Sequence, residues 1–417
     1  MTDRRLWLRT LAGAIIGAGC GCASLLDFDD VTFEPTSDAA AGSGGLAFGG
    51  NPGGGAAGGP SGGAAGAGGG AGGAGGGAAS GGGGSGGAPS GGGTSSGGAP
   101  AVACSPSCAY GFYCDPTVQL CKCLPGFVQN GTSCEPILPG DPATHTQSEV
   151  CQRWQQGNQL TDFSPWTAGP TECDPGTTSR AGITDAMARI NMYRWLVGLG
   201  PAVDDPDMNE SLRSCAVLAS WNPPGTVPNP HSPPSTAKCY TAQGASGTGS
   251  SNLSWGVGVA EAITQFIIDN GNDTTFGHRR WILSAGTGVT GIGHYAGGGP
   301  YGAATCQYAF GGGTTYPAPS WISLPPPGFS PTEVVNYDWT FHASVSVGSA
   351  TITVTRVSDN QNMAMTKLPL SGGYGSYQTV AFRKQGWSAQ AGQTYQVTIS
   401  DISGGPIAYE VKPVACN

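Results

Sequence analysis

In three places, the middle of the chain alternates apolar and polar residues with the period of an α-helix. The first segment stops at the Gly-Leu-Gly-Pro run of residues 198–201, which is typical of a helix end. In the second, Asp205 can cap a helix that has Pro206 in its first position. The third is expected over residues 258–269. The expected inner residues are Ile183, Met187, Ile190, Tyr193 and Val197, then Met208, Leu212, Cys215 and Ala219, then Ala262, Ile263 and Phe266.

Two later segments break and alternate like short strands. They are GVTGIGHYAGG at residues 288–298 and TCQYAF at residues 305–310. Helices around a small antiparallel sheet would make residues 178–313 an α/β domain of the α-β-α sandwich type. Residues 331–417 alternate throughout, with Gly and Asn/Asp turns between the runs. That spacing predicts an all-β, immunoglobulin-like sandwich. It holds no cluster of titratable residues, so its expected role is packing or presentation.

Composition changes this picture at the N-terminal end. The chain has 74 glycines, and their excess lies before residue 100 without a period of three. Residues 23–100 are therefore expected to form a disordered Gly/Ala/Ser-rich linker, because they cannot bury enough apolar surface. The net charge is −9, and no Lys/Arg-rich run interrupts the acidic balance. Nucleic acid is not an expected partner.

Residues 1–22 have the features of a bacterial export signal. A basic stretch, RRLWLR, precedes a short apolar core, and a Gly-Ala-Gly run leads to Cys20. This ending resembles a lipobox, which implies that a lipid on Cys20 anchors the protein to a membrane. Cys22 is the second candidate, and the paired arginines resemble a twin-arginine signal. The alternative is plain cleavage and secretion. Either way the protein is expected outside the cytoplasm, at the cell surface or in the periplasm.

Six cysteines fall in residues 101–136 with the spacing C-x3-C-x5-C-x6-C-x-C-x10-C. A segment this small cannot build a hydrophobic core and needs disulfides. The spacing resembles an EGF-like module, which implies the pairs Cys104–Cys114, Cys108–Cys121 and Cys123–Cys134. The adjacent CKC pair and the oxidising context argue against a zinc site. Six further cysteines allow three bridges, for which sequence proximity suggests Cys151–Cys173, Cys215–Cys239 and Cys306–Cys416.

Three motifs in order carry a second resemblance. HSPP at 231–234, SSNLSWG at 250–256 and GHRRWIL at 277–283 resemble the CAP domain, the superfamily of cysteine-rich secretory, antigen-5 and pathogenesis-related proteins, also called SCP domains, in its bacterial form. The resemblance implies a surface cleft where two histidines and two acidic residues converge. It places His231 and His278 at the histidine positions. Ser251 stands where the family has its first acid, and Asp269 takes the second; Glu261 is the other candidate.

The substitution of Ser251 for an acid weakens any metal site. Two imidazoles, one carboxylate and a hydroxyl supply fewer charges than zinc sites normally have. We therefore expect His231, His278 and Asp269 to bind a divalent cation such as zinc only weakly. The competing interpretation of His231 is a loop histidine that bonds to the backbone. For Glu261 it is a favourable interaction with the helix dipole.

The GHRRWIL run raises the question of what its other residues do. Gly277 allows a close approach of the backbone, and residues 281–283 should bury one side so that His278 points outward. Arg279 and Arg280 are expected to pair with nearby acids rather than face an anionic ligand. His294, in a predicted strand, is expected to be a strand residue and not a ligand.

We expect a non-catalytic binding module whose partner is a small apolar ligand, a protein or a glycan surface. No nucleophile elbow supports Ser251 as a nucleophile, and the G-x-S-x-G strings fall in the Gly-rich linker. One alternative is an extracytoplasmic hydrolase, either metal-assisted or of the Ser-His type. The other is a structural protein of the cell surface.

The lipobox interpretation makes the first prediction. Cys20→Ser should move the protein from the membrane fraction to the soluble fraction, because the lipid would have no attachment point. Fractionation and immunoblotting measure the shift, with Cys22→Ser as the matched control. Membrane association that survives both changes would contradict anchoring through either cysteine.

Overall fold

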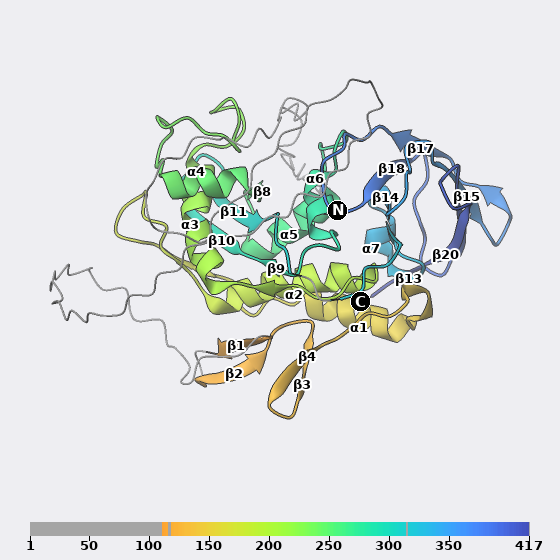
Figure 1. Cartoon of the computed structure of the whole chain (residues 1–417), viewed down its shortest axis with the longest axis horizontal. Coiled ribbons are helices and arrows are strands. Elements are labelled where there is room, and N and C mark those ends of the chain that lie inside the picture. Colours follow the sequence, from red (N-terminus) through yellow and green to blue (C-terminus); the bar gives the residue numbers. More distant parts are fainter. Residues whose placement is uncertain (1–110, 116–117, 314–315, 417) are drawn as a thin grey trace, which may run out of the picture. The chain divides into compact units, whose positions relative to one another are not determined.

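The computed structural model describes residues 111–115, 118–313 and 316–416, which belong to one compact unit (Figure 1). The expected signal, lipobox and linker lie outside these residues, as do Cys104 and Cys108. Within the described part, no helix is long and apolar enough to cross a membrane.

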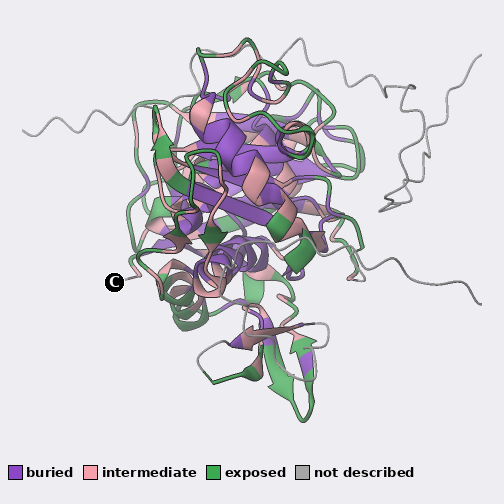
Figure 2. Ribbon diagram, turned by 90° about the vertical axis from the view of Figure 1, so that its left-hand side faces the viewer, coloured by how far each residue is buried: buried purple, intermediate pink, exposed green. Residues whose placement is uncertain are grey.

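Two antiparallel hairpins open the described chain. They are β1 (Phe112–Asp115) with β2 (Leu120–Cys123) and β3 (Phe127–Asn130) with β4 (Ser133–Pro136). The expected bridge Cys123–Cys134 is confirmed. Cys114 and Cys121 are also disulfide-bonded, and their expected pairing with Cys104 and Cys108 falls outside the described residues. Most residues of these four strands are exposed or half-buried (Figure 2), as expected of a segment held together by disulfides.

A short 3₁₀ helix, η2 (Pro142–Thr144), leads into α1 (Gln147–Asn158). The sequence pattern did not predict α1, since only Val150 and Gly157 in it are buried. It begins with a capping box, in which the Thr146 hydroxyl accepts from the Glu149 N–H and the Glu149 carboxylate accepts from the Thr146 N–H. The T-x-x-E motif was the signal that could have located this helix.

The three predicted helices are present as α2 (Arg180–Leu196), α3 (Pro206–Trp221) and α5 (Val259–Ile268). Asp205 caps α3 as predicted, accepting hydrogen bonds from the N–H groups of Asp207 and Met208. Between α3 and α5 lie α4 (Ala242–Gly249) and strand β8 (Ser251–Trp255), and α6 (Gly277–Ile282) follows. Two short ladders join β5 (Trp166–Thr167) to β6 (Thr177–Thr178) and β7 (Val203–Asp204) to β9 (Val289–Thr290).

The helices cover both faces of a three-stranded antiparallel sheet. Its strand order is β10 (Ile292–Gly299), β11 (Gly302–Tyr308), β8. Leu253 packs in the cluster that includes Leu212 of α3, whereas Ser254 bonds to Gln265 of α5. Adjacent strand residues point to opposite faces, so α3 lies on one face and α5 on the other. The expected arrangement of helices around a small sheet is therefore present.

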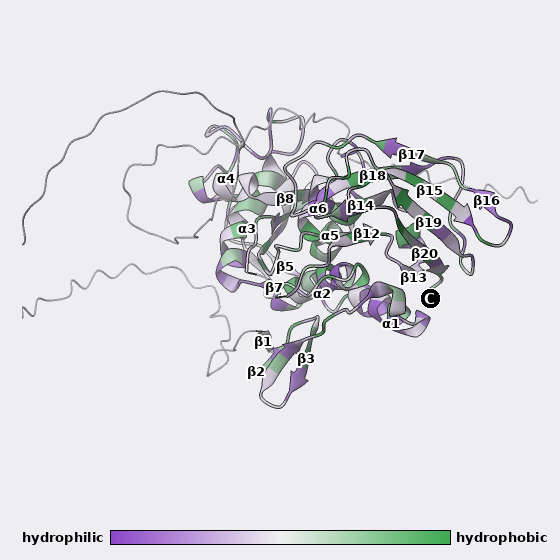
Figure 3. Ribbon diagram, turned by 45° about the vertical axis from the view of Figure 1, so that its right-hand side comes forward, coloured by the Kyte–Doolittle hydropathy of each residue, from purple (hydrophilic) through white to green (hydrophobic). Residues whose placement is uncertain are grey.

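The C-terminal part consists of two sheets enclosing their own apolar core. The first has the order β12 (Trp321–Leu324), β14 (Trp339–Ala343), β18 (Gln378–Lys384), β17 (Met365–Leu368). The second has the order β13 (Gly328–Pro331), β20 (Ile407–Val414), β19 (Tyr395–Ser400), β15 (Thr351–Arg356), β16 (Gln361–Asn362), with α7 (Thr332–Val335) following β13. Hydrophobic residues line the strands of both sheets (Figure 3).

The largest core cluster crosses the predicted domain boundaries. Met187 of α2 and Ile263 of α5 share it with Leu324 of β12, Val334 of α7 and Val414 of β20. The helical part and the C-terminal sheets thus bury apolar surface against each other. Their division into separate domains stays a prediction.

The structure overturns the three cysteine pairs suggested outside the EGF-like segment. The bridges are Cys151–Cys416, Cys173–Cys239 and Cys215–Cys306 instead of Cys151–Cys173, Cys215–Cys239 and Cys306–Cys416. Proximity in sequence failed because the pairs follow packing: Cys215 of α3 lies over Cys306 of β11, where helix and sheet meet. Cys416 does tie the C-terminus to the rest of the fold, but through α1.

The Cys151–Cys416 bridge closes 265 residues and should constrain the unfolded chain more than Cys173–Cys239, which closes 66. Replacing both members of the first pair by serine should lower the free energy of unfolding by about 2–5 kcal/mol. The serine pair at 173 and 239 is the matched control and should cost less. Denaturant unfolding measures both. An equal or smaller loss for the first pair would contradict this account.

Candidate functional site

His278 lies in the first turn of α6, and its ring is held by a carboxylate. Its Nδ1 is 2.8 Å from Oδ1 of Asp269. A carboxylate accepts, so Nδ1 donates this bond, and in the neutral form of the ring the lone pair is on Nε2. The side chain of His278 is 21 % exposed and that of Asp269 is 1 % exposed. The helix therefore presents one imidazole of fixed tautomer at the edge of the buried interior.

Asp269 is fixed by the way α5 ends. It is the C-cap residue and adopts the left-handed conformation, with φ of 57°. Its second oxygen accepts from the backbone N–H of Arg279 at 3.1 Å, and its first also accepts from Asn272. Its carboxylate thus orients the ring of His278 in the manner of groups that support ligating or catalytic histidines.

His231 lies in the loop between α3 and α4. Its backbone N–H donates to the side chain of Asn229, and its Nδ1 donates to the carbonyl of Thr248 at 2.8 Å. This ring therefore has the same tautomer as that of His278. Burial lowers the pKa of His231 to about 4, the bond to Thr248 opposes this, and the nearby His278 lowers the pKa further. The two imidazoles are close enough to influence each other electrostatically.

Of the sequence-predicted residues, His231, His278 and Asp269 come together. We call these three residues the histidine site. Glu261 is in the first turn of α5, and Asp269 caps the opposite end about 12 Å further along the helix axis. Glu261 therefore does not share the carboxylate position, and its place suits the helix dipole.

Ser251 begins β8, three residues after the Thr248 carbonyl that holds His231. It is 5 % exposed, and within the described chain its hydroxyl has no hydrogen-bond partner. Its neighbour Asn252 donates to the backbone carbonyl of His278. Ser251 is thus placed next to segments that hold both histidines, but it is bonded to neither ring.

The histidine site departs from the expected metal set and from the expected surface cleft. Among the described residues, no group of three His, Cys, Asp or Glu side chains is arranged to hold a metal ion. Asp269 is engaged with Nδ1 of His278, so it supports the ring rather than standing beside Nε2 as a third ligand. Two imidazoles alone do not fit the three or four protein ligands typical of zinc. The site also lies deeper than expected, since Asp269 and Ser251 are buried.

The two arginines after His278 correct a further expectation. Neither pairs with a carboxylate in the described structure, and both are buried away from any ligand. Arg279 donates to the carbonyls of Ile267, Ile268 and Asp338. Arg280 donates to the carbonyls of Thr275 and Ser371. Their role is to attach α6 to the end of α5 and to the C-terminal sheets.

His294 is a strand residue, as predicted. It is buried in β10, where its Nδ1 contacts the hydroxyl of Thr305 at 2.9 Å. Burial lowers its pKa to about 4.

An aromatic cluster beside the histidine site was not predicted. Trp281 is one helical turn after His278, so the two share a face of α6. Its ring contacts that of Phe310 at 4.8 Å and that of Tyr374 at 6.2 Å. Tyr308, the strand partner of Ser251, completes the cluster, and Phe310 is 43 % exposed. In the sequence, Tyr308 and Phe310 lie in the strand pattern TCQYAF and Trp281 lies in GHRRWIL, whereas neither motif includes Tyr374.

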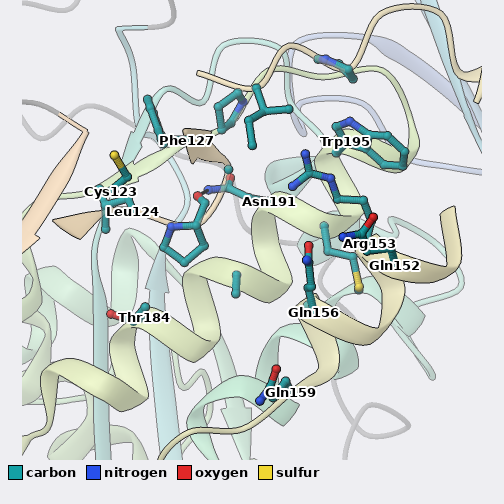
Figure 4. Close-up of a pocket in the computed structure, with 18 of the residues that line it drawn as sticks. Cys123, Leu124, Phe127, Gln152, Arg153, Gln156, Gln159, Thr184, Asn191 and Trp195 are labelled. Carbon is teal, nitrogen blue, oxygen red and sulfur yellow. Dashed lines mark hydrogen bonds between the residues drawn. The ribbon is translucent and has the colours of Figure 1, made fainter. Parts of the chain in front are cut away.

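The structure also contains a cavity of about 770 Å³ away from the histidines. It lies between the hairpins and helices α1 and α2 (Figure 4), and its lining includes neither the residues of the histidine site nor Ser251 or Glu261. The chemical features of the motifs and this cavity are therefore in different places.

Comparison with known proteins gives no identification: no family model, no curated protein and no solved structure matches this chain.

The lowered pKa values of His231 and His294 predict loss of stability in acid. Both rings titrate near pH 4 when folded and near 6.5 when unfolded, so the unfolded chain binds more protons between these values. Their contribution is complete above pH 6.5 and is lost as the pH falls through 4. Each pKa unit corresponds to about 1.4 kcal/mol.

Urea unfolding at pH 7 and pH 4.5 measures this effect. His294→Gln should show a shallower fall than the parent, whatever its stability at pH 7. An equal slope in parent and variant would contradict the buried neutral state of His294.

Proposed function

We propose that the chain is an exported CAP/SCP-like protein that binds a glycan, without catalysis, at the histidine site and the adjoining aromatic cluster. The observation that carries the proposal is the placement of His278 and Trp281 on one face of α6, next to the exposed ring of Phe310. A neutral imidazole accepts hydrogen bonds from sugar hydroxyls. Aromatic rings pack against the apolar faces of the sugar.

The choice of a glycan over the other expected ligands follows from the combination of a polar imidazole with aromatic rings. A purely apolar ligand would offer no hydrogen bond to Nε2 of His278. A protein partner would normally need a wide surface with a central apolar anchor. The rings of Trp281 and Phe310 beside a polar histidine suit a small hydroxyl-rich ligand better.

The remaining parts of the proposal concern the location of the protein in the cell and the roles of its N-terminal segments. Every described cysteine is disulfide-bonded, which is consistent with an extracytoplasmic protein. We infer that Cys20 carries a lipid, that residues 23–100 hold the folded part away from the membrane, and that the two hairpins belong to an EGF-like module. The order of the three CAP-like motifs supports the family assignment.

A hydrolase is the second candidate, and one observation favours it. The Asp269–His278 bond has the geometry of the acid and base members of a catalytic triad. Ser251 is the adjacent hydroxyl, but it makes no bond to either imidazole within the described chain. A nucleophile and its base are expected within hydrogen-bond reach. This is why we place binding ahead of hydrolysis.

A glycan array with the full-length chain tests the proposal. Phe310→Ala should weaken binding of the recognised glycan about tenfold, because it removes an exposed ring. Tyr301→Ala removes another exposed ring, in the turn between β10 and β11, and should leave binding unchanged. His278→Gln should also weaken binding, with circular dichroism confirming the fold. Equal binding by all variants, or no glycan bound, would contradict the proposal, and labelling of Ser251 by a fluorophosphonate probe would favour the hydrolase.

A further inference from the structure

The cavity between the hairpins and the helices has two walls of different chemistry. Leu124 and Phe127 of the hairpins and the following Ile137 and Leu138 form an apolar wall. Leu138 is 56 % exposed although it is a large apolar side chain. The other wall is α1 with part of α2, and α1 is predominantly hydrophilic (Figure 3). A volume of about 770 Å³ is in the range of sites for small ligands.

The polar wall is built on one face of α1. Gln152, Gln156 and Gln159 lie four and three residues apart, which places them in one row along the helix side and its C-cap. Arg153 lies next to this row (Figure 4). In the described structure, the side chains of these four residues make no hydrogen bond or ion pair with protein. The three glutamines are exposed and Arg153 is half-buried, so their donors and acceptors are available to a ligand in the cavity.

Two features hold α1 in place. The capping box of Thr146 and Glu149 fixes its first turn. Gly157 packs so closely on Met192 of α2 that a Cβ there would lie 2.5 Å from that side chain. The three glutamines are thus not needed to hold the helix. The row of glutamine side chains does not contribute to the packing of the core.

The hairpin wall is attached to α2 by a specific contact. The amide of Asn191 donates to the carbonyl of Pro125 at 2.7 Å and to that of Ala202 at 2.8 Å. Gly126 packs against Pro201 with a φ of 91°, where a side chain would not fit. The cavity is therefore formed before any ligand binds.

Arg153 is the cationic group of the cavity, whose lining also includes the carboxylates of Glu149 and Asp185. Its guanidinium lies 5.4 Å from the ring of Trp195, whose ring also stacks with His145 at 3.9 Å. Burial lowers the pKa of Arg153, and the negative charge of Glu149 opposes this. Glu149, one turn earlier, is occupied by the capping box. A guanidinium in this position can bind a carboxylate with two parallel hydrogen bonds.

The same contacts disfavour a sugar in this cavity. Trp195 is only 8 % exposed, because His145 and Arg153 cover it, and Phe127 is 7 % exposed. The rings of Trp195 and Phe127 thus offer no open face to a sugar, and the ring of the half-buried Tyr113, which also lines the cavity, has the guanidinium of Arg180 at 5.3 Å. Side-chain amides in a row suit a different ligand, since each has the donor and acceptor that an extended peptide backbone requires.

We propose that this cavity is a second binding site, for a short extended peptide that carries a carboxylate side chain. The carboxylate binds Arg153, the backbone bonds to Gln152, Gln156 and Gln159, and a neighbouring apolar side chain packs on Leu138. This site is independent of the histidine site and of the function proposed for it.

The test uses the full-length chain and two peptide pools. One pool has the pattern acetyl-X-X-Glu-X-amide and the other acetyl-X-X-Gln-X-amide, where X is any residue except Asp, Glu and Cys. Retained peptides are counted by mass spectrometry after passage over immobilised protein. We expect the Glu pool to be retained about tenfold more than the Gln pool.

Variants locate the site. Arg153→Met should abolish the preference for Glu, and Gln156→Ala should reduce retention of both pools several-fold. Lys367→Met removes a charge from β17 in the C-terminal sheets and is the matched control, which should leave retention unchanged. The melting temperature of each variant checks that it is folded.

Two outcomes would overturn the proposal. One is equal retention of the two pools by the parent chain, or an unchanged preference for Glu in a folded Arg153→Met variant. The other is retention of oligogalacturonate in place of the peptides, which would assign the guanidinium to an acidic sugar.

Discussion

The rest of the structure depends on one buried cation, the guanidinium of Arg279. The residue is 0 % exposed, and its nitrogens donate to the carbonyls of Ile267 and Ile268 at the end of α5 and of Asp338 before β14. A buried charge is tolerated only where hydrogen bonds replace its hydration. These carbonyls can meet Arg279 only if α5, α6 and the C-terminal sheets are assembled as they are. The geometry of the histidine site follows, because the backbone N–H of the same residue holds the carboxylate of Asp269.

This dependence explains why charged residues follow His278 in a chain with few charges. Arg280 bonds to Ser371 and lies 5.2 Å from the ring of Tyr374, which in turn covers Gly277 so closely that no Cβ would fit. Arg280 therefore attaches α6 to a loop 91 residues later in the chain. Ile282 and Leu283 are buried, as the pattern predicted, whereas Trp281, expected to be buried with them, is half-buried on the face of α6 that carries His278. The C-terminal sheets thereby help to position the histidine site, which is a more specific role than presentation.

Sequence predicted the parts of the fold whose signals are local. The period of α2, the Asp205-Pro206 start of α3 and the Phe266-to-Asp269 spacing are each set within a few residues, and the structure agrees with them. The disulfide pairs failed because Cys173 and Cys239 are joined by the folding of a loop, which no local pattern records. The prediction of carboxylate partners for the two arginines failed for a related reason. A guanidinium can be satisfied by carbonyls, and any residue supplies a carbonyl, so the sequence carries no mark of the partner.

The histidine site and the cavity differ in how the fold prepares them. At the histidine site Nδ1 of each ring already donates a hydrogen bond to protein. The fold thereby fixes the tautomer of both rings before a ligand binds. Much of the polar surface of this site is buried. At the cavity the side chains of Gln152 and Gln156 make no hydrogen bond with protein in the described chain, and the contacts of Arg153 are with the ring of Trp195 and the charge of Glu149. Ordering these long side chains on a ligand costs conformational entropy, which favours weak and selective binding. A protein that uses both would bind one ligand through preorganised rings and another through side chains that become ordered on contact.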